Sequence, residues 1–367
     1  MLQIEKDPTF YRVREKVIIH IPGSSRYGGG GANNEDEKQV IVLSMPGESY
    51  GHYYDLKTLE KIAEFIKEMD QKTFGRDDLF VVHDDTGLKP RYLGNYNFIN
   101  AKLIKVPVGQ TLDLWMRDFP PAMPKQQIKF KYDPDYLKET DKAKTDTVTF
   151  KRFAEMIGIP PMHLSDIVIE GGNIVENGKD IAITTARIYN DNPSIEQAQL
   201  VRKLENEINR TVVVLDDPKD TTGHSDGLVS FVDENTLLIS MFDDADAPRY
   251  YSSMEKAVTS KFPNVTVVPL PCYTKKDTEH GFKTAEGSYA NSLVTNNAVY
   301  VAMYANQAAN AVAERVFRDN TPITKEVIPV YKAGEVPILG GSVRCMSWQI
   351  DRNHPVAQAL ISYVEKL

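Results

Sequence analysis

Three stretches of the chain share one pattern, in which two short apolar runs flank a polar turn that contains asparagine. They are residues 172–184, 227–240 and 291–302. The turn asparagines, Asn177, Asn235 and Asn297, follow one another at intervals of about 60 residues. Asn and Gly tolerate the positive φ angles that hairpin turns require. The pattern therefore predicts three β-hairpins that belong to an internal repeat.

Helical patterns separate these hairpins. Leu200, Leu204 and Ile208 recur at four-residue spacing, and Asn192-Pro193 is a suitable helix start because Asn is a good N-cap and Pro fits the first turn. Further helices are predicted over residues 56–69, 254–258 and 307–318. Strands are predicted over residues 40–44, 79–82, 103–106, 327–330 and 336–339.

A repeat of this length divides the 367 residues into about five or six units. Units that each leave one face of a sheet uncovered have to stack, and a closed ring buries all of those faces. The alternative is an irregular α/β domain whose hairpins are alike only because all hairpins are. The sequence thus indicates an α/β protein and leaves the ring open.

The charge balance narrows the choice of partner. The chain has 43 Lys and Arg against 51 Asp and Glu, a net charge of −8. This excess argues against nucleic acid as the main partner and favours a cationic small molecule. No run approaches the roughly 18 apolar residues of a membrane span, and the N-terminus lacks an apolar signal core. Because the chain has only two cysteines, we expect a cytoplasmic protein without disulfides. We expect no membrane partner, and whether the chain forms a homo-oligomer stays open.

The residues suited to chemistry stand at equivalent places, beside the predicted hairpins. They are Trp115, Arg117 and Asp118 after the strand 103–106, Glu170 before the first hairpin, His224 and Asp226 before the second, Asn291 before the third, and Gly341, Arg344 and Cys345 near the C-terminus. In a ring these positions converge on the axis, so one Cys, one His and three carboxylates would share a pocket. Gly28–Gly31, by contrast, lacks the Lys-Ser/Thr of a phosphate-binding loop and is expected to be an exposed loop.

Each of these residues also has a structural interpretation. Cys345 alone would more often be a small core residue, which is how we interpret Cys272. His224 and Asp226 are two residues apart, so on a strand both would face one side. Arg117 is expected to form a structural ion pair with Asp118. Trp115 is either core or a wall of the pocket.

The surplus of acceptors points to a substrate. Buried carboxylates need a partner, and a guanidinium supplies positive charge and a planar fork of N–H donors. Attack of the Cys345 thiolate on the guanidinium carbon, with His224 as acid and base, would release ammonia and then a ureido product. A metallohydrolase with His224 and Asp226 as ligands is an alternative, which leaves the cysteine unused.

The ordered set Trp-x-Arg-Asp, Glu-Gly-Gly, Gly-His-x-Asp and Gly-Gly-x-x-x-Cys resembles the agmatine deiminase and Porphyromonas-type peptidylarginine deiminase family. The resemblance implies the five-bladed α/β propeller called the pentein fold, in one catalytic domain over residues 1–367, with no cofactor and no metal. It implies Cys345 as nucleophile, His224 as acid and base, Asp118 and Asp226 on the guanidinium, and Glu170 in support. Asn291 matches a position that some peptidylarginine deiminases use.

The resemblance leaves the substrate open. Agmatine, giving carbamoylputrescine, and arginine in a peptide, giving citrulline, are expected equally. Arg344 stands where these proteins commonly carry His, and we expect it to meet a substrate carboxylate. We expect Gly341 and Trp115 to help form the substrate site. A free-arginine deiminase and a non-catalytic pentein-fold binding protein are the alternatives.

Overall fold

The computed structural model describes residues 38–47, 55–87, 92, 95–216, 222–243, 245–273, 278–279, 282–336 and 340–367. Internal contacts divide the chain into two units, Met1–Ala32 and Asn33–Leu367, and the described residues all belong to the second. The loop expected at Gly28–Gly31 lies outside the described residues. The expectation of one domain over residues 1–367 stays a prediction.

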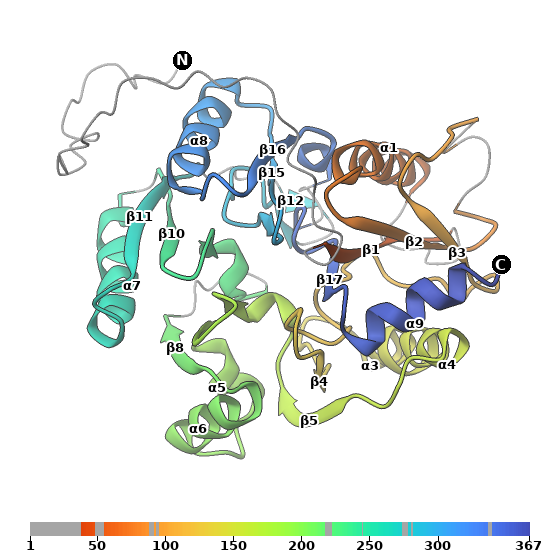
Figure 1. Ribbon diagram of the computed structural model, residues 1–367. Coiled ribbons are helices and arrows are strands. Elements are labelled where there is room, and N and C mark those ends of the chain that lie inside the picture. Colours follow the sequence, from red (N-terminus) through yellow and green to blue (C-terminus); the bar gives the residue numbers. More distant parts are fainter. Residues whose placement is uncertain are drawn as a thin grey trace. The chain divides into compact units, whose positions relative to one another are not determined.

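The described strands form five sheets and one separate hairpin (Figure 1). The first sheet has the order β17 (Trp348–Asp351), β1 (Gln39–Met45), β2 (Asp78–His83), β3 (Lys102–Lys105). The others are β4 (Ile128–Lys131) with β5 (His163–Val168); β6 (Val175–Glu176), β7 (Ile181–Thr185), β8 (Thr211–Leu215); β9 (Val229–Phe231), β10 (Thr236–Met241), β11 (Thr266–Pro271); and β14 (Leu293–Val294), β15 (Ala298–Ala302), β16 (Glu326–Val330). The separate hairpin pairs β12 (Thr278–Glu279) with β13 (Phe282–Lys283).

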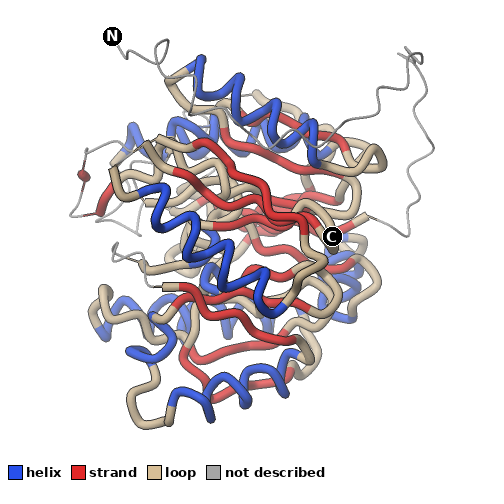
Figure 2. Tube along the Cα trace, turned by 90° about the vertical axis from the view of Figure 1, so that its left-hand side faces the viewer, coloured by secondary structure: helices blue, strands red, loops and turns tan. Residues whose placement is uncertain are grey.

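The sheets repeat one plan, which confirms the three predicted hairpins. In three of them the first two strands are antiparallel, and a helix then leads to a third strand parallel to the second. The connecting helices are α6 (Gln197–Ile208), α7 (Ala247–Lys261) and α8 (Gln307–Asn320). Figure 2 shows strands through the interior and helices toward the outside.

The first sheet follows the same plan with strands from both ends of the described chain. β17 pairs antiparallel with β1, and α1 (Leu56–Thr73) then leads to β2, parallel to β1. In the β4–β5 sheet an antiparallel bridge between Ala122 and Ile128 stands where a hairpin strand would be. Its connection holds α3 (Glu139–Ala143), the π-helix Lys144–Phe150 and α4 (Lys151–Ile157). Five units of one kind are therefore present.

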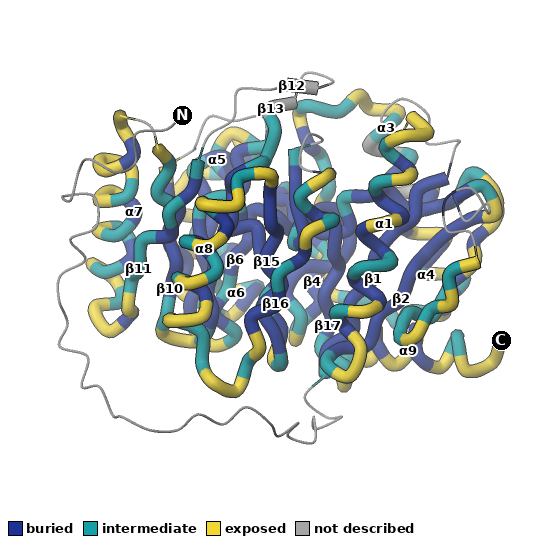
Figure 3. The backbone as a smooth tube through the Cα atoms, turned by 90° about the horizontal axis from the view of Figure 1, so that it is seen from above, coloured by how far each residue is buried: buried dark blue, intermediate teal, exposed yellow. Residues whose placement is uncertain are grey.

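Apolar residues of the strands and of the inner helix faces form the core. Leu200, Leu204 and Ile208 are fully buried, as their spacing predicted. In Figure 3 most of the central strands are dark blue, β11 being largely of intermediate burial, whereas many of the exposed positions lie on the helices and turns. α9 (Pro355–Val364) packs with β17 in a cluster that includes Trp348 and Leu360. None of the described helices combines the length and the apolarity needed to cross a bilayer.

Two local predictions were wrong. Asn192 does not cap the helix that buries Leu200, because α6 starts at Gln197 with Glu196 as its N-cap. Asn192 ends the short helix α5 (Arg187–Asp191) instead, and its side-chain amide bonds to both backbone groups of Val168 in β5. The strand expected over 336–339 is absent at Val336, which ends a 3-10 helix, and residues 337–339 lie outside the described part.

Candidate active site

The residues expected to carry chemistry occupy equivalent positions in the five units. Each lies in the segment that precedes the first strand of its unit, so the five segments meet at the same end of the sheets. These segments are residues 115–118 before the Ala122 bridge, 170–173 before β6, 224–226 before β9, 291 before β14 and 341–345 before β17. The predicted convergence is therefore observed for these residues.

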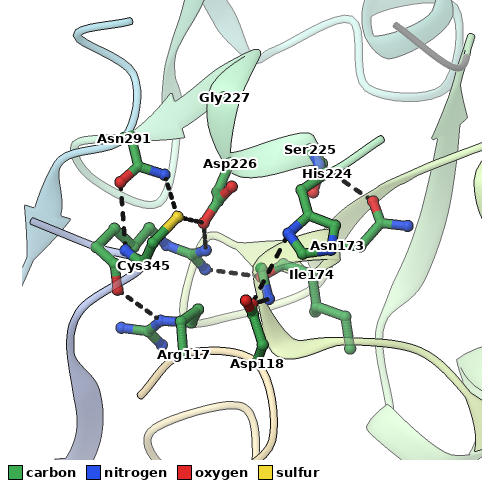
Figure 4. A network of polar contacts seen from close by, with 12 residues as sticks. Arg117, Asp118, Asn173, Ile174, His224, Ser225, Asp226, Gly227, Asn291 and Cys345 are labelled. Atoms are coloured by element: carbon green, nitrogen blue, oxygen red, sulfur yellow. Dashed lines mark hydrogen bonds and ion pairs between the residues drawn. The ribbon is translucent and has the colours of Figure 1, made fainter. Parts of the chain in front are cut away.

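One cluster surrounds the sulfur of Cys345, which is 7% exposed. The side-chain amide of Asn291 donates to Sγ over 2.9 Å, and Oδ1 of the same amide accepts from the backbone N–H groups of Ser342 and Cys345 (Figure 4). Oδ2 of Asp226 lies 3.6 Å from Sγ. Asn291 thus fixes the loop of Cys345 and offers the sulfur a hydrogen-bond donor.

A second cluster surrounds the buried ring of His224. Nε2 lies 3.4 Å from Oε2 of Glu170, and Nδ1 lies 3.8 Å from Oδ1 of Asp118. The backbone N–H of Gly172 donates to the same Asp118 oxygen over 3.1 Å. His224 precedes a 3-10 turn (Ser225–Gly227) and Asp226 lies within it, so neither stands on a strand. The strand argument for a shared face was therefore wrong, although both residues reach the site.

The electrostatics follow from burying three carboxylates together. Burial lowers the pKa of His224, but Glu170 and Asp118 outweigh that effect and raise it to about 10. Burial also raises the pKa of Asp118, to about 7, against the opposing effect of His224. Burial, Asp226 and Asp118 raise the pKa of the Cys345 thiol well above its usual value. At neutral pH these residues thus include a protonated imidazole and a thiol.

The two arginines of these segments differ from expectation. Arg344 donates to Oδ2 of Asp226 over 2.9 Å and to the carbonyl oxygen of Ile174 over 2.7 Å, so its guanidinium is already engaged and does not stand free to meet a substrate carboxylate. Arg117 forms no ion pair with Asp118. Its guanidinium donates instead to the carbonyl oxygen of Arg344 and, over 3.5 Å, to Oγ of Ser347.

Two glycines allow these segments to approach one another. A Cβ on Gly341 would lie well inside 3.0 Å of both the Trp115 ring and Cβ of Cys345. A Cβ on Gly172 would likewise collide with His224 and Asp118. Trp115 is therefore a wall beside the Cys345 loop, whereas Cys272 lies in the apolar core.

Sequence reasoning missed several supporting residues. The Tyr136 hydroxyl donates to Glu170, and Arg187 lies over the Tyr136 ring and pairs with Asp135. Oδ1 of Asn173 accepts from Ser225 and from Thr185, which ties two neighbouring units together. Asn173 follows the Glu-Gly-Gly motif directly and was within reach of prediction, but Tyr136 stands in a stretch without any motif.

Asp118, Glu170 and His224 are also the kinds of residue that bind metal ions, and their ligand atoms lie within 4.8 Å of one another. However, the two carboxylates face opposite nitrogens of the imidazole. This arrangement favours the charged ring over a shared ion, because a metal ligand must be a neutral imidazole.

Comparison with known proteins agrees with the geometry. The family model of the Porphyromonas-type peptidyl-arginine deiminases matches residues 33–350. The chain belongs to this family. An agmatine deiminase of Medicago truncatula is 26% identical over 234 residues, which are 56% of this chain and 62% of that enzyme. The match thus spans slightly less than two thirds of this relative.

Solved structures show the same fold. The C. jejuni agmatine deiminase superposes with a TM-score of 0.68 at 21% identity, over 86% of this chain and 93% of that one. The agmatine deiminase of Enterococcus faecalis gives 0.66 at 18% identity, over 87% and 95%. Together with the five sheets, these likenesses confirm the expected α/β fold class.

Proposed function

We propose that the protein hydrolyses the guanidino group of an arginine-derived substrate to a ureido group and ammonia. The observation that supports this most directly is the grouping of a buried cysteine with a charged histidine and three buried carboxylates. The protein's own cations compensate these carboxylates in part, and a cationic ligand rich in N–H donors completes the compensation, which a guanidinium provides.

The substrate guanidinium binds to carboxylate oxygens that the protein's own donors do not fully occupy. Oδ2 of Asp226 is engaged by Arg344, while its Oδ1 accepts no hydrogen bond among the described residues. The substrate guanidinium donates to this oxygen and to Asp118, beside the Trp115 ring. Its positive charge then lies close to Cys345 and lowers the pKa of the thiol, so that binding itself favours the nucleophile.

When the substrate binds, the Cys345 thiol loses its proton to solvent. In the first step the resulting thiolate attacks the guanidinium carbon and forms a C–S bond. The C–N bond to one terminal nitrogen breaks, and this nitrogen leaves as ammonia after taking the proton of His224. Glu170 and Asp118 stabilise the imidazolium until that moment. The product of this half-reaction is a thiouronium on Cys345.

In the second step water attacks the thiouronium carbon while His224 accepts one of its protons. The C–S bond breaks, the thiolate is restored, and the second proton of the water passes through solvent to the released ammonia, which becomes ammonium. The neutral ureido product then leaves. The described residues supply every group in this scheme, so it includes no cofactor or metal. The cytoplasmic location and the expected lack of nucleic-acid or membrane partners stay predictions.

Within this chemistry we propose two substrates with equal weight, agmatine and arginine in a peptide. The family match names the peptidyl enzyme, whereas the relatives cited above are agmatine deiminases. Because Arg344 is engaged by Asp226, a carboxylate-reading role for it is not part of the proposal.

The test measures release of ammonia and of ureido product from agmatine, free arginine and an end-blocked arginine peptide. Wild type should turn over one of the three, and Cys345→Ala should lose about 10³-fold or more of that rate. Cys272→Ala is the matched control, since it removes the other buried thiol, and its rate should stay within about threefold of wild type. Equal rates in wild type and Cys345→Ala would refute the thiolate mechanism.

The alternative is a pentein-fold protein that binds guanidinium compounds without turning them over. Saturable binding of one of the three compounds, with no ammonia from any of them, would establish this alternative in place of the enzyme.

A further inference from the structure

A polar cavity of about 380 Å³ lies on the hairpin-turn side of the sheets. Its walls include the turns at Asn177, Glu234 and Asn296, which are at the opposite strand ends from the candidate active site. Arg117 and Arg344 also line it. Arg117 directly precedes Asp118 in the sequence, and Arg344 directly precedes Cys345. The cavity and the candidate active site are therefore adjacent, on opposite sides of these two segments.

The acidic residues of this cavity already have partners. Glu176 pairs with Arg210 over 3.1 Å, and Glu234 pairs with Lys179 over 3.2 Å. Asp233 accepts from the backbone N–H groups of Asn235 and Thr236, both over 2.7 Å. Glu176 and Glu234 are thus paired with cations, whereas Asp233 acts on Lys325 at longer range and partly opposes the effect of burial on its pKa.

Three cations that line the same cavity have no carboxylate within ion-pair distance in the described part of the chain. They are Arg117, Lys325 and Lys125. Arg117 is only 5% exposed and bonds to neutral oxygens alone. Burial and the nearby Arg344 lower its pKa to about 9, and burial lowers the pKa of Lys325. Both charges are thus held at a cost that a bound anion would offset.

We propose that this cavity is a binding site for a small oxyanion, of the phosphate or carboxylate type, held between Arg117 and Lys325. The guanidinium fork suits two oxygens of such a group, and Lys325 adds a second charge-assisted hydrogen bond. The active site cannot be the acceptor of this ligand, because its carboxylates repel anions. The two sites therefore select ligands of opposite charge.

The experiment is calorimetric titration of the full chain with inorganic phosphate and with citrate in a low-salt buffer. Saturable binding of one equivalent of either anion supports the site and identifies the oxyanion class. Lys325→Gln should weaken that binding about tenfold, which is the loss of roughly one charge-assisted hydrogen bond, and Lys325→Arg should retain it. Lys57→Gln is the matched control. Lys57 is exposed on α1, so this substitution removes the same positive charge at a position that does not line the cavity.

Cys345→Ala separates this site from the active site and should bind the anion as wild type does. The absence of saturable binding for both anions would overturn the proposal, as would an equal weakening by Lys57→Gln and Lys325→Gln. The titration needs no turnover, so its result is independent of the proposed deimination.

Discussion

At the scale of single residues, one carboxylate oxygen carries two roles. Oδ2 of Asp226 accepts from Arg344 and lies 3.6 Å from the Cys345 sulfur. Ionising the thiol places a second negative charge beside that oxygen, and Arg344 is the cation that offsets the pair. We therefore infer that Arg344 acts on the Cys345 thiol through Asp226, a role that its position before the cysteine did not indicate.

Arg344→Gln should raise the pKa of Cys345 further, because the thiolate loses this offsetting charge. At pH 8 less thiolate is then present, and the rate of Cys345 alkylation by iodoacetamide should fall about tenfold, the equivalent of one pKa unit. Arg344→Lys keeps the charge and should stay close to wild type. An alkylation rate in Arg344→Gln that follows wild type across the pH range would contradict this role.

Tyr136 supports the histidine from the other side of the site. Its hydroxyl donates to Glu170, whose Oε2 faces Nε2 of His224 over 3.4 Å. In Tyr136→Phe the carboxylate loses this donor and its charge acts more fully on the imidazolium, so the pKa of His224, about 10 in wild type, should rise.

For Tyr136→Phe we expect kcat to fall about tenfold with little change in KM, and the alkaline limb of the pH–rate profile to move upward. Tyr363→Phe, which removes a partly buried hydroxyl on α9, is the control and should leave the profile unchanged. An unshifted alkaline limb in Tyr136→Phe would show that the tyrosine is merely structural.

At the scale of elements, the segments before the first strand of each unit form the site. They are short 3-10 turns or loops, such as Gly171–Asn173 and Ser225–Gly227, and they approach closely because glycine lacks a side chain. The sequence predicted which segments these are. The sequence did not predict that these segments are 3-10 turns. The residues of each turn run directly into the apolar pattern of the following strand, so the pattern does not mark where the turn ends and the strand begins.

Gly172→Ala should displace His224 and Asp118 and lower kcat/KM about 100-fold, because the new Cβ collides with both side chains. Gly227→Ala makes the same change in the neighbouring turn, where the nearest atom to the new Cβ is Oγ of Ser288 at 3.8 Å, and should stay within about threefold of wild type. Steady-state kinetics measure kcat/KM for both variants, and circular dichroism checks that both are folded. Equal activity of the two variants would rule out a steric requirement at Gly172.

At the scale of the described unit, the chain closes on itself through β17 and β1. Gln39 to Val42 pair with Trp348 to Asp351, and α9 then covers the same region. The apolar core beneath the first sheet takes six buried residues from β17 and α9. They are Trp348, Ile350, Val356, Ala357, Leu360 and Ile361. At roughly 1.5–3 kcal/mol for each large side chain, this burial is comparable to the whole stability of a typical domain.

Removing residues 348–367 should therefore abolish cooperative unfolding in urea and leave an aggregating chain. Removing only residues 365–367, which are exposed at the end of α9, should change the free energy of unfolding by less than about 0.5 kcal/mol. A cooperative transition in the longer truncation would show that the remaining sheets do not depend on this closure.

Local pattern alone determined the three hairpins and the four helices that connect strands within the units, because alternation, four-residue spacing and turn chemistry are written in a few neighbouring residues. Tertiary structure decided the contacts between distant units. Asn192 joins Val168 rather than capping α6, Arg344 turns to Asp226, and Tyr136 reaches Glu170. Their physical reason is shared: a polar side chain that becomes buried takes the partner which long-range packing brings to it, and no local pattern encodes that partner.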